Sequence, residues 1–224
     1  MVRVCDEKEI AVIGDVHGEA AALGNALESH LGRRRVVLVG DYVNRGPRSA
    51  KVLDLLAEAL TAEDIFLLMG NHDYEFIRYI ETGDLARFAR IGGLSTIKSY
   101  TGMVEGDLHQ ALLDQIPESH LNLLETLSIS YEDPSLIVSH SGVSPRSPGE
   151  RDVRALVLGS HPELFGAEST NLPKVVVSGH YAQRSMRVFD TAKYICLDSG
   201  CGTLPGAPLA VLEWPERLFS YFEV

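Results

Sequence analysis

The first third of the chain alternates two kinds of hydrophobic pattern. Leucine, valine and alanine recur at helical spacing over residues 19–31 and 48–60, and a third helix is expected around residues 73–80. A short, unbroken apolar run stands before each helix and is expected to be a strand, at residues 10–14, 36–40 and 65–69. Because these runs are apolar throughout rather than alternating, the β-α-β-α-β order predicts a parallel sheet with helices on both faces.

The pattern changes after the third helix. Residues 83–132 combine helical spacing with repeated glycines and predict a helical cap inserted into a single domain of residues 1–224. Three further apolar runs are expected to be strands, at residues 136–138, 175–177 and 194–197. The last two runs, 208–213 and 218–222, flank Pro215 and are expected to form a hairpin that closes a second sheet.

Composition and charge narrow the class of protein. A chain of 224 residues with 45% hydrophobic residues can bury the core of one globular domain. The net charge of −11 argues against a protein that grips nucleic acid through its phosphates, since that requires a basic face. The one run of basic residues, Arg33–Arg35, leads directly into an apolar run, and we interpret it as the solvated start of a strand.

The cysteines and the first residues bear on the compartment. Cys5, Cys196 and Cys201 cannot all pair and show no CxxC spacing, so reduced thiols are expected. Charged residues stand where a signal peptide would be apolar, and no run of about 18 apolar residues occurs. These features predict a cytoplasmic protein with no membrane partner.

Five of the apolar runs end at, or one small residue before, a side chain that can bind a metal. These side chains are Asp15 with His17, Asp41, Asn71, His140 and His180. Because open α/β sheets bind ligands at the carboxyl ends of their strands, we expect these side chains to converge. A lone histidine is usually structural, but five coincidences of this kind favour a functional site.

The mixture of ligand types indicates the metals. Carboxylate, amide and imidazole ligands without thiolate suit Mn²⁺, Fe or Zn²⁺ better than Mg²⁺ or Ca²⁺, which prefer shells of oxygen alone. Two such ions about 3.5–4 Å apart can share a hydroxide and clamp the attacking and leaving oxygens of an in-line displacement.

The motifs around these residues carry a family resemblance. GDVHG (14–18), GDYVNRG (40–46), GNHD (70–73), SHSG (139–142) and GH (179–180) resemble the calcineurin-like metallophosphoesterases. Within that superfamily, the chain looks like the bacterial relatives of the Ser/Thr protein phosphatases, close to the diadenosine tetraphosphatases. The resemblance implies an α/β fold: a four-layer α/β/β/α sandwich of two mixed sheets with a helical cap.

The resemblance also implies a role for each motif residue. Asp15 and His17 would bind the first metal, Asp41 would bridge to the second, and Asn71, His140 and His180 would complete the second site. Two divalent ions are implied, with Mn²⁺ expected first and Fe, Zn or Ni as alternatives. Arg45 would bind phosphate oxygens through its planar fork, and His72 would be the general acid that protonates the leaving oxygen.

The chain departs from the protein phosphatase pattern at two places. Asn44 stands where these enzymes have an acidic residue that holds the catalytic histidine as a cation, so His72 should be a more weakly supported acid. A second phosphate-binding arginine is missing near residues 159–161. His161 either substitutes for it in substrate binding or is an ordinary loop residue, and Arg151, Arg154 and Arg184 are further candidates.

Three functions are compatible with these features. The first expectation is a Ser/Thr protein phosphatase-like hydrolysis of phosphomonoesters, on a phosphorylated protein or a small phosphoester. The alternative is a dinucleoside polyphosphate hydrolase, because a phosphoanhydride has a good leaving group and needs less help from a general acid. A lesser alternative, supported by Asn44 and the missing arginine, is a non-catalytic module that binds metal and phosphate.

Overall fold

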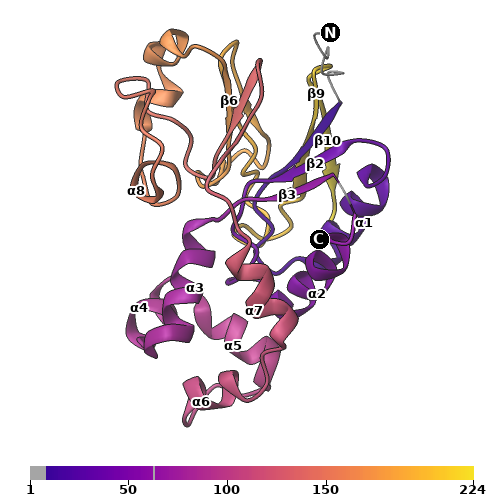
Figure 1. The fold of residues 1–224 in the computed structure, drawn as a ribbon, viewed down its shortest axis with the longest axis vertical. Coiled ribbons are helices and arrows are strands. Elements are labelled where there is room, and N and C mark those ends of the chain that lie inside the picture. Colours follow the sequence, from indigo (N-terminus) through magenta and orange to yellow (C-terminus); the bar gives the residue numbers. More distant parts are fainter. Residues whose placement is uncertain (1–8, 63) are drawn as a thin grey trace, which may run out of the picture.

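The computed structural model describes residues 9–62 and 64–224, and within them the strands form two sheets (Figure 1). The first sheet has the order β10-β9-β1-β2-β3. Its strands are β1 (Ile10–Ile13), β2 (Arg35–Leu38), β3 (Ile65–Leu67), β9 (Leu209–Trp214) and β10 (Leu218–Phe222). Here β1, β2 and β3 are parallel, and the β9–β10 hairpin joins β1 in antiparallel orientation.

The second sheet has the order β4-β5-β6-β8-β7. Its strands are β4 (Tyr131–Glu132), β5 (Leu136–Val138), β6 (Val175–Ser178), β7 (Phe189–Asp190) and β8 (Tyr194–Cys196). The central strands β5, β6 and β8 are parallel, and the two-residue strands at both edges are antiparallel. Both sheets are therefore mixed.

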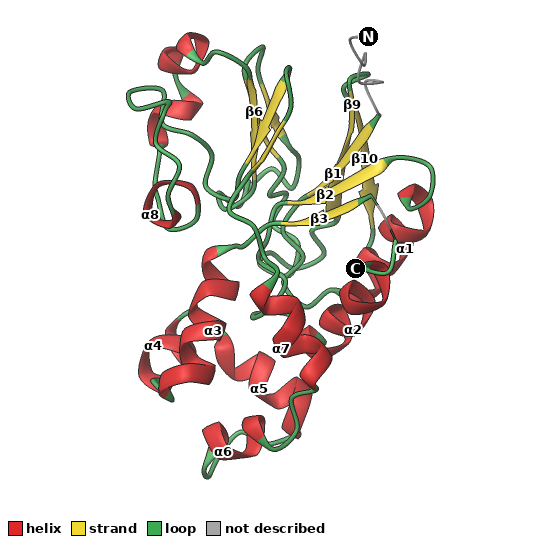
Figure 2. Cartoon of the chain, viewed as in Figure 1, coloured by secondary structure: helices red, strands yellow, loops and turns green. Residues whose placement is uncertain are grey.

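Helices cover the outer face of each sheet (Figure 2). On the first sheet these are α1 (Ala20–His30) and α2 (Ser49–Ala59); on the second they are α8 (Val153–Leu156) and the 3₁₀ turns Pro162–Phe165 and Ala167–Asn171. Each buried strand sends alternate side chains to its two faces. Ile13 packs among α1 and α2, whereas Val12 packs between the two sheets. A third apolar cluster, with Ile137 and Leu164, lies under the 3₁₀ turns. The predicted four-layer α/β/β/α sandwich is confirmed.

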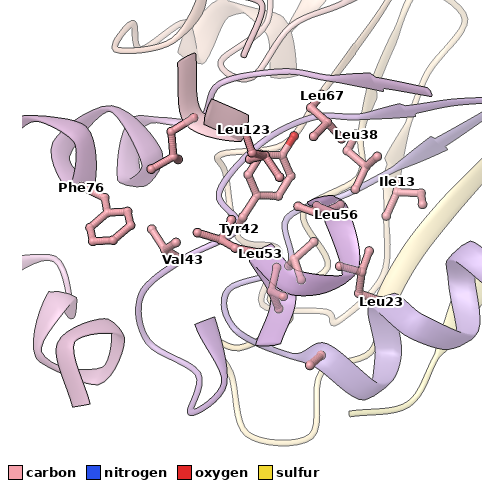
Figure 3. Close-up of a cluster of buried hydrophobic side chains, with 14 of the residues drawn as sticks. Ile13, Leu23, Leu38, Tyr42, Val43, Leu53, Leu56, Leu67, Phe76 and Leu123 are labelled. Atoms are coloured by element: carbon pink, nitrogen blue, oxygen red, sulfur yellow. The ribbon is translucent and has the colours of Figure 1, made fainter. Parts of the chain in front are cut away.

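The remaining helices lie together beyond one end of the sheets, in the lower half of Figure 1. They are α3 (Asn71–Thr82), α4 (Leu85–Arg90), α5 (Gly93–Thr101), α6 (Leu108–Leu113) and α7 (Glu118–Glu125). Figure 3 shows Phe76 of α3 and Leu123 of α7 in the same apolar cluster as Tyr42 and Leu53. The predicted segment 83–132 thus contains α4 to α7 but also β4, which belongs to the second sheet. Its role as a cap stays a prediction.

The predicted strands and helices of the first third all occur, with ends shifted by at most a few residues. One expectation is wrong: the hairpin of residues 208–213 and 218–222 extends the first sheet instead of closing the second. Val12 pairs with Leu212, and such a pairing joins residues 200 positions apart. The apolar pattern of β9 fits a buried position in either sheet, so only the tertiary packing decides its neighbour.

Two further expectations concern the membrane and the cysteines. Among the described residues no helix is both long enough and apolar enough to cross a membrane. Cys196 and Cys201 are buried and unpaired, as expected, whereas Cys5 lies outside the described residues. Arg35 begins β2, which agrees with the interpretation of the basic run as the start of a strand.

Candidate metal centre and active site

The carboxylate of Asp41 lies between two histidines that come from different sheets. Its Oδ2 is 3.4 Å from Nε2 of His17, and its Oδ1 is 3.4 Å from Nε2 of His140. Two ligand atoms that each stand about 2.1 Å from one ion lie roughly 3.0–3.4 Å apart. Each oxygen of Asp41 is therefore spaced to share a different ion with a different imidazole, which is what a bridging carboxylate requires.

Backbone carbonyls orient both of these imidazoles. Nδ1 of His17 lies 3.0 Å from the carbonyl oxygen of Val43, and Nδ1 of His140 lies 3.1 Å from that of Val39. A carbonyl oxygen only accepts, so Nδ1 carries the proton in each ring and the Nε2 lone pair is directed at Asp41. A hydrogen bond of this kind fixes the tautomer that metal-ligating histidines need.

Asn71 and His180 bring further acceptors to the same point. Asn71 Oδ1 lies 2.9 Å from Nε2 of His140 and 2.9 Å from Nδ1 of His180. With the proton of His140 on Nδ1 and the amide of Asn71 oriented with Oδ1 inward, Nε2 of His140 faces the amide oxygen, one acceptor against another. A cation between them would satisfy both, so the residues present fit a metal ion.

Asp15 supplies a carboxylate oxygen that the described residues leave without a hydrogen bond. The side chain is buried, and its Oδ2 accepts the backbone N–H of His180 at 3.0 Å, whereas Oδ1 has no partner. A carboxylate oxygen of Asp15, one of Asp41 and a ring nitrogen of His140 all lie within 4.8 Å of one another. A buried carboxylate without a partner is costly unless it binds a cation, so Asp15 also fits a metal ligand.

Glycines allow this close packing of acidic side chains. A Cβ atom on Gly179 would stand 1.8 Å from Asp15 Oδ1, and one on Gly70 would stand 2.1 Å from Asp41 Oδ1. Both distances are far inside van der Waals contact. The glycines of the GH and GNHD motifs are thus required by the approach of the backbone to the carboxylates.

Burial sets the protonation of the cluster. It is the main cause that lowers the pKa of His17 to about 3 and that of His180 to about 4, with the positive charge of Arg45 as the next cause in each case. Burial and the neighbouring acids Asp198 and Asp41 raise the pKa of Asp15 well above its usual range. The histidines are therefore neutral at pH 7, with lone pairs available for a metal. The positive charge of Arg45 lowers the pKa of Asp15, but it does not outweigh burial and the neighbouring acids.

His72 lies between Asn44 and Arg45. Nη2 of Arg45 is 3.0 Å from Nε2 of His72, and the amide nitrogen Nδ2 of Asn44 is 3.0 Å from its Nδ1. A guanidinium can only donate, so Nε2 must accept and the proton of the neutral ring must be on Nδ1. The amide of Asn44 must then present its oxygen to Nδ1, which a half-turn of the carboxamide achieves.

Thr96 of α5 holds the other end of that amide. Its hydroxyl oxygen lies 2.8 Å from Asn44 Oδ1, accepts the backbone N–H of Asn44 at 2.8 Å, and donates to Ser49 Oγ at 3.1 Å. Once the amide is turned, the Asn44 NH₂ donates to Thr96, and each group in the chain from Ser49 to His72 has a partner. His72 is thus oriented by a fully buried network that contains no charge.

Arg45 also contacts His17, an expected ligand of the first metal. Its Nη1 is 2.9 Å from Nε2 of His17 and donates to the hydroxyl of Thr203. The guanidinium therefore lies directly over the metal-facing nitrogen of His17 and beside His72. From this position it can bind the oxygens of a phosphate that sits at the centre.

The structure places His161 differently from a phosphate-binding residue. Its Nε2 donates to the carbonyl oxygen of Ala155 at 2.8 Å, and its backbone N–H donates to the hydroxyl of Tyr181 at 2.7 Å. This leaves the imidazole one ring nitrogen, Nδ1, for any further partner. Arg151 is bound to Glu132, away from the centre. This geometry favours the structural role for His161, and its part in substrate binding stays a prediction.

Two acidic residues of the centre were not among the predicted site residues. Asp73 accepts the backbone N–H groups of Asp41, Tyr42 and Gly70 at 2.7–2.9 Å and so fixes the loop that carries Asp41. Asp198 is buried beside Asp15, and burial raises its pKa to about 6. The sequence contained the signal for Asp198, because it directly follows the apolar run of residues 194–197, as the predicted ligands follow their runs.

Convergent acceptors at the strand ends, with a guanidinium over them, define a metal-dependent hydrolase centre. The family comparison agrees: residues 8–184 match the model of the calcineurin-like phosphoesterases. The chain belongs to this family and is a metallophosphoesterase, as the motifs implied.

The sequence identity between this chain and individual relatives is low. The bis(5'-nucleosyl)-tetraphosphatase PrpE [asymmetrical] of Oceanobacillus iheyensis is 24% identical, over 94% of this chain and 90% of that protein. A bis(5'-nucleosyl)-tetraphosphatase, symmetrical, of Escherichia coli is 28% identical, over 72% of this chain and 56% of its own. The cold-active protein-tyrosine phosphatase of a psychrophilic Shewanella species shares the fold, with a TM-score of 0.63 at 17% identity, over 96% of this chain and 80% of that one.

Proposed function

We propose that this metallophosphoesterase hydrolyses a phosphoanhydride bond of dinucleoside polyphosphates, with diadenosine tetraphosphate as the representative substrate. The observation that carries the proposal is the uncharged support of His72 by Asn44 and Thr96. A general acid without an anionic partner gives little help to an alkoxide leaving group. A nucleotide phosphate leaves readily without that help. Relatives named as tetraphosphatases support the same class.

Each residue of the centre has a part in this reaction. Asp15, His17, Asp41, Asn71, His140 and His180 would hold two divalent ions, which lower the pKa of a water molecule and neutralise phosphate charge. Arg45 binds the phosphate under attack and opposes the charge that builds up on its oxygens. His72 would act as the general acid: its Nε2, once released from Arg45 and protonated, donates the proton to the leaving oxygen.

The metal and the compartment belong to the proposal as well. Manganese is the first ion to test, because the ligands mix carboxylate, amide and imidazole. The free, buried thiols Cys196 and Cys201 support a reducing compartment, so we place the enzyme in the cytoplasm. Its substrates are then small nucleotides of the cell.

Hydrolysis of phosphomonoesters is the second candidate. It is supported by the resemblance of the motif set to the bacterial relatives of the Ser/Thr protein phosphatases. The two candidates differ in the leaving group, a nucleotide phosphate in one and an alkoxide in the other. They can therefore be separated by substrate.

The test is a side-by-side assay of the Mn²⁺-loaded protein with diadenosine tetraphosphate, a phosphoserine peptide and p-nitrophenyl phosphate. We expect kcat/KM to be highest for the tetraphosphate and lowest for the peptide. Preferred turnover of the peptide would favour the second candidate. Phosphate binding without turnover of any of the three would identify a non-catalytic module.

A further inference from the structure

A cavity of about 280 Å³ opens beside the metal centre. It is lined by Asn71, Glu75, Arg87, Ile91, Leu158 and His180. Asn71 and His180 are expected metal ligands, so the cavity is continuous with the place where a phosphate would be cleaved. The other four residues come from α3, from α4 and the turn after it, and from the loop after α8. The cavity therefore lies between the helices at the end of the sheets and the second sheet's outer layer.

Arg87 provides the positive charge in the lining of this cavity. It belongs to α4, and its side chain is 53% exposed. Its Nη2 donates to Glu75 Oε1 at 2.5 Å. Glu75 follows Asn71 by four residues on α3, so the two side chains lie on the same face of that helix. Arg87 is thus anchored one helical turn from an expected metal ligand.

The anchor leaves Arg87 able to bind an anion. A guanidinium has five N–H donors, and Glu75 uses one of them. The carboxylate of Glu75 is itself only 9% exposed and is turned towards Arg87, so it orients the guanidinium. The pair presents donors to the cavity at little cost in side-chain entropy, because the arginine is already held in place.

We propose that Arg87 forms a second anion subsite, which binds a phosphate adjacent to the one that is cleaved. The inference rests on the proposed function and narrows its substrate class to molecules with at least two linked phosphates. It also supplies a second cation near the centre, in a chain that lacks the second phosphate-binding arginine of the protein phosphatase pattern near residues 159–161. Ile91 and Leu158 form the apolar part of the lining and would contact the organic group beyond that phosphate.

If Arg87 binds a second phosphate, its replacement should affect some substrates and not others. Replacement of a purely structural arginine would not distinguish them. A substrate with one phosphate, such as p-nitrophenyl phosphate, has no second phosphate to place beside Arg87, whereas a polyphosphate has one. Replacement of Arg87 should therefore change KM for one class of substrate and leave the other class untouched.

The experiment compares Arg87→Ala with Arg90→Ala, which removes an exposed arginine of the same helix that does not line the cavity. In the Mn²⁺-loaded protein, Arg87→Ala should raise KM for diadenosine tetraphosphate about tenfold, as expected for one charge-assisted hydrogen-bonded contact. KM and kcat for p-nitrophenyl phosphate should stay within about twofold of the parent. Arg90→Ala should resemble the parent for both substrates, and Arg87→Lys should recover part of the loss.

Binding gives a readout that does not depend on turnover. Measured by calorimetry, Arg87→Ala should weaken inorganic triphosphate about tenfold and leave orthophosphate unchanged. Equal affinity of parent and variant for triphosphate would overturn the subsite. Loss of p-nitrophenyl phosphate turnover in both Arg87→Ala and Arg87→Lys would also overturn it, since Arg87 would then act through the fold. If no substrate is turned over but Arg87→Ala still binds triphosphate more weakly than the parent does, the proposed function fails and the subsite stands.

Discussion

Charged side chains have different surroundings at the two ends of the first sheet. At the amino ends of its parallel strands, Arg34 pairs with three carboxylates at 3.0–3.2 Å, those of Glu9, Glu213 and Glu216. At the carboxyl ends, several buried carboxylates and imidazoles face one another beneath the guanidinium of Arg45, and Asp15 Oδ1 has no partner among the described residues. At one end, the carboxylates lie at the surface and share ion pairs with an arginine of the chain. At the other, the carboxylates are buried, and the arrangement fits cations in addition to Arg45.

Non-glycine residues with positive φ gather at the carboxyl ends, whereas Arg217 (58°) is the example in the turn at the amino end. Five residues of the carboxyl-end loops have positive φ although they are not glycine: His17 (42°), Asp41 (55°), Asn44 (72°), Arg45 (65°) and His180 (70°). Such conformations cost about 1–3 kcal/mol each when the side chain does not favour them. Strain of this kind persists where the surrounding structure holds it, here through Asp73 and Thr96. The backbone conformation of the centre therefore lowers the stability of the metal-free chain, and metal binding should raise that stability again.

The sharpest way to test the contrast is to change the bridging carboxylate. Asp41→Asn should reduce turnover on the order of 10³-fold, because the loss of a ligand shared by two ions removes several kcal/mol of transition-state stabilisation. The metal-free variant should nevertheless melt about 2–4 °C higher than the parent, since burial and neighbouring Asp73 raise the pKa of Asp41 and disfavour its charge. Assays and thermal unfolding check both parts. A lower melting temperature would show that the acidic cluster is not strained.

Removal of His72 separates catalysis from metal binding. His72→Ala should lower turnover about 10²–10⁴-fold for a phosphoserine peptide and less for diadenosine tetraphosphate, whose leaving group needs less protonation. Metal content, measured by elemental analysis, should stay at two ions per chain. Because a His72 nitrogen also lies within 4.8 Å of ligand atoms of His17 and Asp41, loss of one ion would instead make His72 a ligand.

Asn44→Asp restores a charge beside His72. The new carboxylate can accept from Nδ1 of His72 and from Thr96, so it should raise turnover of poor leaving groups about tenfold and leave the tetraphosphate nearly unchanged. The ratio of the two kcat/KM values measures the effect. If both substrates lose activity, Asn44 serves some purpose other than support of the acid.

Metal binding should release protons from the acids of the centre. Burial raises the pKa of Asp73 to about 7 and that of Asp198 to about 6, so the metal-free protein holds protons at pH 6 that it loses by pH 8. A group with a raised folded pKa is protonated more in the folded chain, so Asp73 and Asp198 contribute less to the stability of the metal-free protein as pH rises over this range. His17 and His180 have the opposite effect below about pH 7.5, because their imidazoles, with an unfolded pKa of about 6.5, still hold protons only in the unfolded chain there.

Calorimetry in buffers of different ionisation enthalpy measures this release. Mn²⁺ affinity should rise up to about tenfold per pH unit between pH 6 and 8 if one proton leaves. The same affinity at both pH values would contradict a coupling between the metals and these carboxyls. His17 and His180 are already neutral in this range, so the effect reports the acids.

The smallest effect is expected at the opposite end of the sheet. Arg34→Ala should cost about 1 kcal/mol of unfolding free energy, since its partners are partly exposed and the pairs are screened. Chemical denaturation measures this cost. Turnover should not change, and a fall in turnover would break the separation between the two ends.

The sequence alone determined where the strands and helices of the first third lie, and it predicted most residues of the centre but not Asp73 or Asp198. Apolar runs and helical spacing predicted the strands and helices of the first third. The position of polar residues directly after apolar runs predicted Asp15, Asp41 and His140 as metal ligands. These signals are local. Burial requires apolar residues at particular spacings within one element, and a strand end lies next to its own ligand in the chain.

Only the tertiary structure decided how these parts combine. It put the β9–β10 hairpin in the first sheet, directed the two oxygens of Asp41 at different histidines, and brought Arg87 to the cavity beside Asn71. The apolar runs are alike in pattern, so their spacing does not say which strands pair. The direction of a buried polar side chain follows from neighbours distant in sequence, whose packing and hydrogen bonds exist only in the folded chain.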